Sequence, residues 1–359
     1  MRRSKTLVIN TSEPDNEPFV SVVMPVRNEA TFIARSLGAV LAQDYPSSRM
    51  EVIISDGMSS DSTRHIVSRF QTQDPRVKLI DNHGQIVPTG LNLAIEYAHG
   101  DVIVRVDGHC EIADDYVRRC VEHLVNDDVD AVGGPLETVG ETPRAAVIAR
   151  AMSSSFGVGN SAFRTTHNKT MLTDTVAFPA YSRQVIAQVG RFDEELVRNQ
   201  DDEFNYRLRK IGAKILLASD VHCRYYSRSS FRSLWKQYFQ YGYWKIRVIQ
   251  KNPRQVRLRQ FVPSIFVTAL ITSLLMIPLL SISGLIFGMI VTTYLVAILV
   301  ASLFEAKRTQ EQSLTLLPVA FATLHVSYGL GFIVGLAWFW NRWGNIKNRV
   351  GPIHVQRQS

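Results

Sequence analysis

The chain has 359 residues, enough for one large domain or two modest ones. It carries 40 Lys and Arg against 32 Asp and Glu, a net charge of +8. The excess of positive charge gathers between residues 224 and 259, directly before a long apolar region, which favours a membrane surface over nucleic acid. Cys110, Cys120 and Cys223 have neither metal-ligand spacing nor a paired framework, so we expect reduced thiols. The apolar stretch at the N-terminus is too short to predict a signal peptide.

Strands and helices alternate over the first 132 residues, after a polar lead-in at 1–17. The expected strands are 20–26, 51–54, 77–80, 102–106 and 131–132, and the expected helices are 29–42, 62–70, 90–98 and 114–125. Strict alternation with short turns predicts an α/β fold, in which helices cover both faces of a mostly parallel sheet. No Gly-x-Gly-x-x-Gly follows the first strand, so the fingerprint of a dinucleotide-binding domain is missing.

Polar side chains follow three of these strands, at the edge where open α/β sheets bind ligands. The first strand ends at Pro25, and Arg27 and Asn28 beyond it offer hydrogen-bond donors. The second ends at Asp56, which can accept hydrogen bonds from a nucleobase or a ribose. Each of these residues alone is also typical of an ordinary turn. Three such strand ends at one edge favour a ligand site.

The strand at 102–106 ends on Asp107-Gly108-His109. A carboxylate beside an imidazole suits a divalent cation that also holds phosphate oxygens. The alternative is that Asp107 caps the following turn and His109 is a solvated loop residue. Spacing alone leaves both interpretations open.

Four segments, taken in order, resemble successive motifs of the family 2 inverting glycosyltransferases. They are residues 22–29, 51–63, 90–92 and 107–109. The resemblance runs over about residues 18–245 and implies a nucleotide-sugar domain of the Rossmann-like GT-A type. The glycine-rich stretch 153–161 is expected as an active-site loop or a plain linker. Together with Asp107-Gly-His109 and the segment 174–183, which resembles the family's segment beneath the acceptor pocket, it is similar to the succinoglycan and exopolysaccharide branch.

The resemblance also implies roles for individual residues. The implied nucleotide-binding residues are Pro25, Arg27, Glu29, Asp56 and Asp107. Asp107 and His109 stand where the family has an Asp-x-Asp motif, which implies Mg²⁺ or Mn²⁺. His109 departs from that motif, and His222 is a further candidate for a metal ligand or a phosphate contact.

A helical pattern over 199–208 carries three acidic residues, 201–203, in its first turn. There they complement the helix dipole, which is one sufficient explanation for them. By resemblance Gln200 replaces the Glu of a Glu-Asp motif, and Asp201 matches the catalytic base. Asp202 is the alternative base, and we expect Gln200 and Asp202 in the acceptor or donor pocket.

Gln240 and Trp244 are similar to the Gln-x-x-Arg-Trp signature of processive family members and are expected near the same pocket. Tyr243 replaces the Arg, which argues against processive synthesis. Aromatic residues interleaved with Lys and Arg predict an amphipathic interfacial segment at 229–260. The same aromatic side chains could instead cover the protein core.

No charged residue occurs between 261 and 304, and a second apolar run covers 314–340. At roughly 20 residues a span, this predicts transmembrane helices at 261–281, 284–304 and 314–340, before a basic tail at 341–359. Three full spans would place that tail opposite the basic segment 245–259, against the positive-inside tendency. Either the third run is re-entrant or doubled, or the rule fails, and we favour a cytosolic tail.

Together these patterns predict a multi-pass protein of the inner or plasma membrane, with a cytoplasmic catalytic domain at 18–228. The resemblance implies a metal-dependent, inverting hexosyltransferase that uses a nucleotide-diphosphate sugar. The acceptor would be a lipid-linked, polyprenyl-type oligosaccharide or a growing polysaccharide, and no nucleic-acid partner is expected. The alternatives are a polyprenyl-phosphate sugar synthase and a catalytically inactive membrane scaffold.

Overall fold

The computed structural model describes residues 17–159, 161–309 and 314–343. These residues form two compact units. The first comprises 17–137 and 166–225, and the second comprises the described parts of 138–165 and 226–348. The predicted lead-in at 1–17 and tail at 341–359 lie almost entirely outside the described residues.

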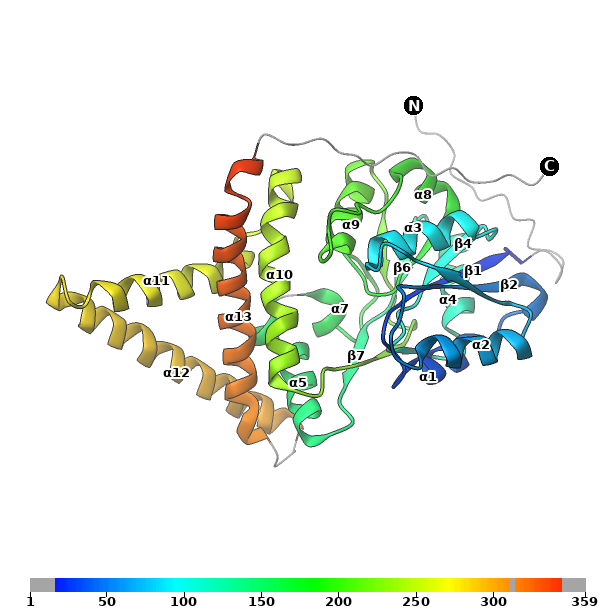
Figure 1. Ribbon diagram of the computed structural model, residues 1–359. Helices are drawn as coiled ribbons and strands as arrows, with labels where there is room; N and C mark the ends of the chain where they lie inside the picture. Colours follow the sequence, from blue (N-terminus) through cyan, green and yellow to red (C-terminus); the bar gives the residue numbers. More distant parts are fainter. Residues whose placement is uncertain (1–16, 160, 310–313, 344–359) are drawn as a thin grey trace. The chain divides into compact units, whose positions relative to one another are not determined.

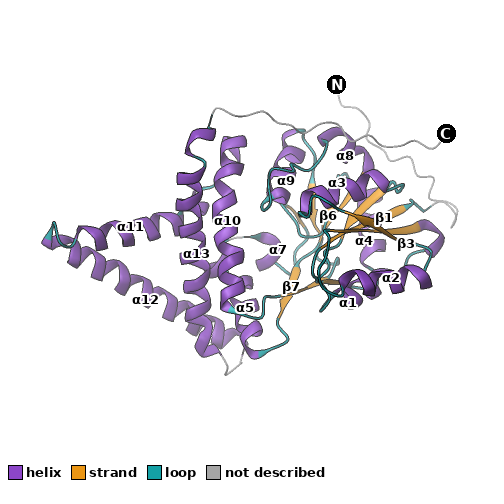
Figure 2. Cartoon of the chain, in the orientation of Figure 1, coloured by secondary structure: helices purple, strands orange, loops and turns teal. Residues whose placement is uncertain are grey.

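The first unit is built on an eight-stranded sheet with the order β3-β2-β1-β4-β9-β6-β10-β8 (Figure 2). Its strands are β1 (Val20–Val26), β2 (Met50–Asp56), β3 (Val77–Asp81), β4 (Val102–Arg105), β6 (Ala131–Gly133), β8 (Met171–Leu172), β9 (Ala180–Ser182) and β10 (Ile215–Leu217). The pairs β1–β2, β2–β3, β1–β4 and β6–β10 are parallel, whereas β9 is antiparallel to both β4 and β6. The predicted mostly parallel α/β sheet is therefore confirmed.

Helices cover both faces of this sheet, with α3 and α9 on one side and α1 and α2 on the other (Figure 1). The helices of this unit are α1 (Ile33–Leu41), α2 (Thr63–Gln73), α3 (Val87–Tyr97), α4 (Tyr116–Asn126), α8 (Arg183–Val189) and α9 (Gln200–Lys210), with a 3₁₀ turn at Ser47–Arg49. Every residue of β1, β2 and β4 is buried, as expected for central strands covered on both faces. A smaller sheet has the order β5-β11-β7, from Cys110–Ile112, Cys223–Tyr226 and Leu136–Val139.

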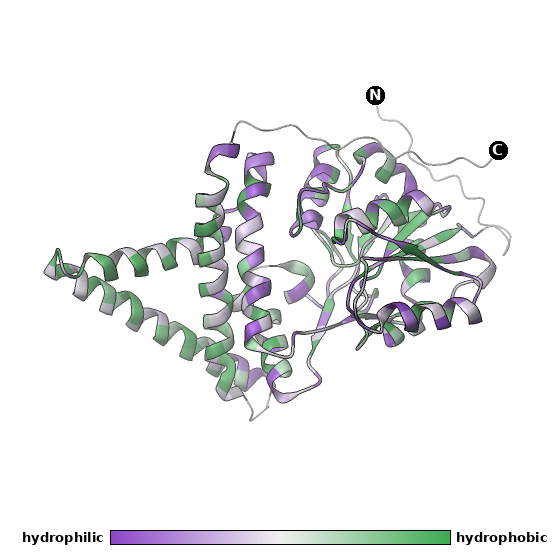
Figure 3. Ribbon diagram, viewed as in Figure 1, coloured by the Kyte–Doolittle hydropathy of each residue, from purple (hydrophilic) through white to green (hydrophobic). Residues whose placement is uncertain are grey.

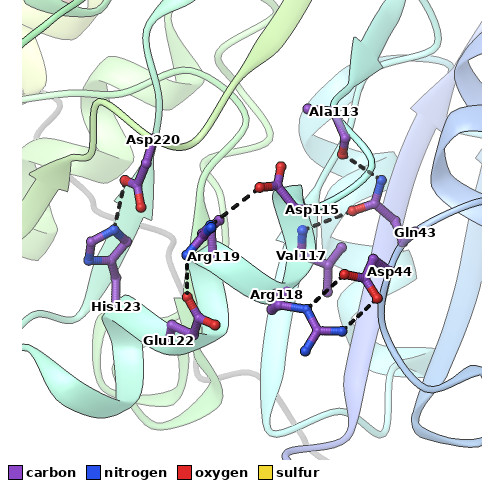
Figure 4. Close-up of polar contacts among 10 residues, drawn as sticks. All are labelled: Gln43, Asp44, Ala113, Asp115, Val117, Arg118, Arg119, Glu122, His123 and Asp220. Atoms are coloured by element: carbon purple, nitrogen blue, oxygen red, sulfur yellow. Dashed lines mark hydrogen bonds and ion pairs between the residues drawn. The ribbon is translucent and has the colours of Figure 1, made fainter.

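Polar contacts fix α4 to the rest of the first unit (Figure 4). Gln43 donates to the Ala113 carbonyl at 2.8 Å and accepts from the Val117 amide at 2.9 Å, so it closes the start of the helix. At the other end, His123 lies 2.9 Å from Asp220 and 2.7 Å from Asp127. The apolar face of α4 can then pack against the sheet without leaving buried polar groups unpaired.

The second unit is helical. Its elements are α5 (Pro143–Ser153), α6 (Ser155–Val158), α7 (Ala162–Thr165), α10 (Phe231–Lys251), α11 (Val262–Met276), α12 (Ser281–Thr309) and α13 (Leu317–Trp338), with 3₁₀ turns at Pro253–Gln255, Leu258–Gln260, Leu314–Leu316 and Trp340–Arg342. The sequence predicted a continuous catalytic domain over 18–228, but segment 138–165 belongs to the second unit. The reason is burial: α5 and α6 pack on α13, and α6 lies within the stretch 153–161 that was expected as an active-site loop or a plain linker.

Helices α10 and α13 run side by side at very short range because glycines lie at their contact (Figure 1). A Cβ on Gly242 would lie 2.0 Å from the Tyr328 carbonyl oxygen, and one on Gly331 would lie 2.0 Å from the Phe239 carbonyl oxygen. Tyr243 and Trp244, which we considered for the headgroup layer or the core, pack around a buried apolar cluster of the second unit. Both side chains are only half-buried, and the position of segment 229–260 in the headgroup layer stays a prediction.

Helices α12 and α13 are long and apolar enough to cross a membrane, and α11 is a shorter apolar helix of 15 residues (Figure 3). The three predicted spans correspond to these three helices. At 15 residues, however, α11 falls short of the roughly 20 residues that a full span requires. The number of crossings stays a prediction.

Candidate active site

A buried arginine joins the two acids that the sequence analysis placed at the reaction centre. Arg105 ends β4, and its Nε and Nη2 donate to the two oxygens of Asp107 at 2.9 and 3.2 Å. Its Nη1 donates to Oδ1 of Asp201, in the first turn of α9. The sheet edge and a helix distant in sequence thus meet at one guanidinium. The sequence analysis predicted both acids but did not single out Arg105.

The charges of this cluster are unequally exposed to water. The side chains of Arg105, Asp107 and Asp201 are 7%, 19% and 43% exposed. Burial raises the pKa of Asp201 above its ordinary value, Arg105 opposes this, and Asp107 and Asp202 add to it. Water moderates the effect because much of the Asp201 side chain is accessible. Burial lowers the pKa of Arg105, but the two carboxylates raise it further, so the guanidinium stays cationic.

His109 is oriented by Glu29, which follows β1. The Nδ1 atom of His109 lies 2.9 Å from Oε1 of Glu29, and its ring packs edge-on against Tyr225 at 4.9 Å between centroids. Gly108 permits this approach, because a Cβ there would lie 2.9 Å from Cγ of Glu29. With Nδ1 engaged by a carboxylate, Nε2 is the ring nitrogen that could coordinate a cation.

The side chains of Asp107 and His109 can be compared with the ligands that a divalent cation requires. Among the described residues there is no group of three or more His, Cys, Asp or Glu side chains that could hold an ion. One carboxylate from Asp107 and one imidazole nitrogen from His109 nevertheless fit a cation that takes its remaining ligands from diphosphate oxygens and water. The residues therefore fit a shared Mg²⁺ or Mn²⁺ site and do not form a complete protein cage.

The predicted nucleotide-pocket residues at the ends of β1 and β2 lie side by side, since Val26 pairs with Asp56. Asp56 is fully buried and accepts from the hydroxyl of Ser59 at 2.5 Å, from the Ser59 amide at 3.1 Å and from Arg64 at 3.2 Å. These contacts are those of a turn-forming residue, which is the alternative given for Asp56 in the sequence analysis. A nucleotide contact for Asp56 stays a prediction.

The loop after β1 is held to the loop after β2. The side-chain oxygen of Asn28, whose φ is +55°, accepts from the Ser60 amide at 2.8 Å, and Thr63 Oγ1 accepts from the Glu29 amide at 2.7 Å. Arg27 is exposed and donates to the Gln85 carbonyl at 3.0 Å, while Pro25 is buried in β1. These contacts fix the backbone at the carboxyl edge of the sheet.

The remaining predicted residues fall in different places. Gln200 is buried beside Asp201, and its Oε1 has no hydrogen-bond partner within the part of the chain that the structure describes. His222 is exposed, and its carbonyl accepts from the Ala113 amide at 3.0 Å. Gln240 and Trp244 lie on α10 in the second unit. Pocket roles for these four residues stay predictions.

Asn92 on α3 fixes the segment that leads into α9. Its side chain accepts from the Phe192 amide at 2.8 Å and donates to the Phe192 carbonyl at 2.9 Å and to Glu194 at 2.8 Å. This pairing places residues 192–194 against the helix that follows β3. These contacts hold the segment before α9 in place and so help to position Asp201 beside Arg105.

Comparisons with known proteins agree with this geometry. Residues 21–190 match the model of Glycosyl transferase family 2. The chain is 34% identical over 251 residues to the succinoglycan biosynthesis protein ExoA of Rhizobium meliloti, an alignment that covers 67% of this chain and 73% of that protein. It is 27% identical over 326 residues to dolichyl N-acetyl-alpha-D-glucosaminyl phosphate 3-beta-D-2,3-diacetamido-2,3-dideoxy-beta-D-glucuronosyltransferase of Methanococcus voltae, covering 89% and 97% of the two chains.

A solved structure shares the fold. The mannosyltransferase PcManGT from Pyrobaculum calidifontis, solved in complex with GDP-Man and Mn²⁺, superposes with a TM-score of 0.55 at 19% identity. The superposition covers 90% of this chain and 88% of that one. The predicted GT-A-like fold is confirmed, and so is the resemblance to the exopolysaccharide branch. The chain belongs to glycosyl transferase family 2.

Proposed function

We propose that the protein is a membrane-attached, inverting hexosyltransferase. It would move a sugar from a nucleotide-diphosphate donor to a hydroxyl of a lipid-linked oligosaccharide or polysaccharide. The observation that carries the proposal is the convergence of Asp107 and Asp201 on the Arg105 guanidinium. It brings Asp107, the acid proposed to lie near the donor diphosphate, and Asp201, the half-exposed proposed base, together at the carboxyl edge of the sheet.

In this reaction Asp201 accepts the proton of the acceptor hydroxyl. The acceptor oxygen forms a bond to the anomeric carbon while the bond from that carbon to the diphosphate oxygen breaks, which inverts the centre. The raised pKa of Asp201 makes it a better base than an ordinary aspartate. Arg105 holds one oxygen of that carboxylate, and the exposed part of the side chain stays open to an acceptor.

The leaving diphosphate gains negative charge as this bond breaks. A Mg²⁺ or Mn²⁺ held by Asp107 and by Nε2 of His109 would neutralise that charge when bound. Glu29 fixes the orientation of the His109 ring before any donor arrives. The guanidinium of Arg105 keeps a permanent positive charge beside the same two acids, so neither acid faces the other uncompensated.

Attachment to a membrane would keep a polyprenyl-type acceptor near the site and raise its effective concentration. Helices α12 and α13 have the length and hydropathy for contact with a bilayer. The basic segment before α11 supports a catalytic unit on the cytoplasmic side. The name of the relative from Methanococcus voltae includes a dolichyl-linked sugar phosphate, which is consistent with such an acceptor.

The test is transfer by the purified full chain, assayed with a panel of radiolabelled nucleotide sugars and membrane-extracted lipid acceptors. Asp201→Asn should lower the transfer rate by about 10²–10⁴-fold, the usual range for loss of a general base. Asp202→Asn tests the alternative base in the same turn: a smaller loss than that of Asp201→Asn supports the assignment, and a larger loss transfers the role to Asp202. Near-native transfer by Asp201→Asn would remove the proposed base.

Two other outcomes identify the alternatives. Transfer to a lipid phosphate that survives Asp201→Asn indicates a polyprenyl-phosphate sugar synthase, because that acceptor is already anionic. Failure of the unsubstituted chain to bind any nucleoside diphosphate by calorimetry indicates an inactive scaffold.

A further inference from the structure

We infer that α11 and α12 form a re-entrant hairpin, which enters the hydrocarbon of a bilayer and turns within it. Both ends of the hairpin would then stay on the side from which it enters. The inference rests on the membrane attachment proposed above and is independent of the transfer chemistry. It concerns residues 262–309, all of which belong to the second unit.

The surface of the hairpin is apolar from end to end. Only 6% of the most apolar window of α12 is buried inside the protein, against 44% for α13. The turn between α11 and α12 is Ile277-Pro278-Leu279-Leu280, and the side chains of Leu279 and Leu280 are 73% and 51% exposed. A hairpin that crossed the bilayer would deliver these residues to water on the far side. Retention in hydrocarbon avoids that exposure.

The first arm is also too short to cross. At about 1.5 Å per residue, the 15 residues of α11 extend about 22 Å, against a hydrocarbon thickness of roughly 30 Å. Although α12 has 29 residues, it begins at the turn and ends in Lys307 and Arg308. The shorter arm therefore limits the depth that the turn can reach.

Charged residues lie at both ends of the hairpin and at neither side of its turn. Arg257 and Arg259 precede α11, and Lys307 and Arg308 close α12. Positive side chains at both bases are placed to meet anionic headgroups of one leaflet. Glu305 is buried at the same base, where its Oε2 lies 2.9 Å from Nε of Arg150 on α5. This ion pair ties the base of the hairpin to the rest of the second unit.

The direction of the hairpin determines how α13 is oriented relative to the bilayer. Within the second unit the hairpin lies crosswise to the α10–α13 pair (Figure 1). Two elements that cross in this way cannot both follow the bilayer normal. When the hairpin enters the lipid, α13 therefore lies along the surface beside α10. Arg342, which follows α13, then stays on the same side as segment 245–259, in accord with the positive-inside tendency.

The experiment is single-cysteine labelling of the full chain in sealed right-side-out and inside-out membrane vesicles, with a membrane-impermeant maleimide. Ser281→Cys probes the turn, whereas Leu258→Cys and Lys307→Cys probe the two bases; all three positions are exposed in the structure. The native cysteines are buried, so the unsubstituted chain sets the background. We expect both base positions to label from one side, and Ser281→Cys to remain at background from either side until detergent is added.

Other labelling patterns would overturn the inference. Labelling of Ser281→Cys from the side opposite the bases would show a hairpin that crosses the bilayer. Labelling from the same side without detergent would show a hairpin that rests on the surface. Release of the chain by an alkaline carbonate wash would refute membrane attachment itself and leave the transfer assay to decide the chemistry separately.

Discussion

Replacing Arg105 with Met is the sharpest test of the candidate site. The substitution keeps most of the side-chain length and removes the only described group that pairs with both Asp107 and Asp201. Two carboxylates would then face each other without their shared cation. We expect a loss of stability in the first unit, together with a loss of transfer activity.

The magnitude follows from burial. Removing one partner of a fully buried ion pair costs about 3–5 kcal/mol. Here the side chains of Asp107 and Asp201 are 19% and 43% exposed, so water can partly solvate them once Arg105 is gone. Discounting for that screening leaves a decrease of about 2 kcal/mol in the free energy of unfolding. For a unit of this size, the corresponding fall in Tm is roughly 4–8 °C.

The buried thiols provide the assay. Cys110, Cys120 and Cys223 lie in the first unit and are all buried, so a thiol-reactive fluorophore reports on the thermal unfolding of that unit in the full chain. Arg118→Met is the matched control, because its ion pair with Asp44 is largely exposed and should contribute at most about 0.5 kcal/mol.

A double mutant completes the test. Adding Asp201→Asn to Arg105→Met should restore about 1 kcal/mol, since it relieves the repulsion between the two acids. An Arg105→Met protein no less stable than Arg118→Met, or a double mutant with purely additive losses, would refute the role assigned to this guanidinium.

Two further predictions concern stability. Burial lowers the pKa of His123, but its ion pairs with Asp127 and Asp220 raise that pKa above the ordinary value. The stability that these ion pairs contribute is therefore complete below about pH 6.5 and is lost as the pH rises through the folded-state pKa. His123→Gln should therefore flatten the fall of Tm above that pH, measured by circular dichroism, and an unchanged slope would contradict the assignment. Gly331→Leu should cost at least about 2 kcal/mol by forcing α10 and α13 apart. Gly288→Leu, with open space around it, should change stability by less than about 0.5 kcal/mol in the same melts, and equal losses would refute the close packing.

Local patterns predicted the catalytic unit well. The strand expected at 20–26 and β1 have the same bounds, and the strand expected at 51–54 lies within β2. Asp107 could be chosen because a short-range pattern marks the end of its strand, whereas Asp201 was chosen by resemblance to the Glu-Asp motif of the family. Arg105 could not be identified from a local pattern, because its second partner, Asp201, lies on α9, and the spacing of residues in the sequence does not reveal contacts between such distant segments. The available signal was a cation inside an otherwise apolar strand, which requires a partner when buried.

The division into units was harder to predict for a related reason. Within segment 138–165, the stretch 153–161 is rich in glycine and serine and is therefore expected as an active-site loop or a plain linker, and no helix is predicted over 143–153. Helices α5 and α6 of this segment form where α13 offers an apolar partner, and this contact joins residues far apart in the sequence, such as Phe156 and His325, which are 169 residues apart. Tertiary burial of this kind overrides local preference and leaves no mark on the sequence nearby.

The double passage of the chain through the second unit has a practical consequence for anyone preparing a water-soluble fragment. A polypeptide cut after residue 228 would retain α5 and α6 but lose α13. It would leave Gly157 without Leu324, and the Phe156 carbonyl without the imidazole of His325 that lies 2.8 Å away. Such a fragment would present freshly uncovered apolar surface and tend to aggregate. Replacing 138–165 by a short hydrophilic bridge offers a more promising route to crystals of the sheet unit alone.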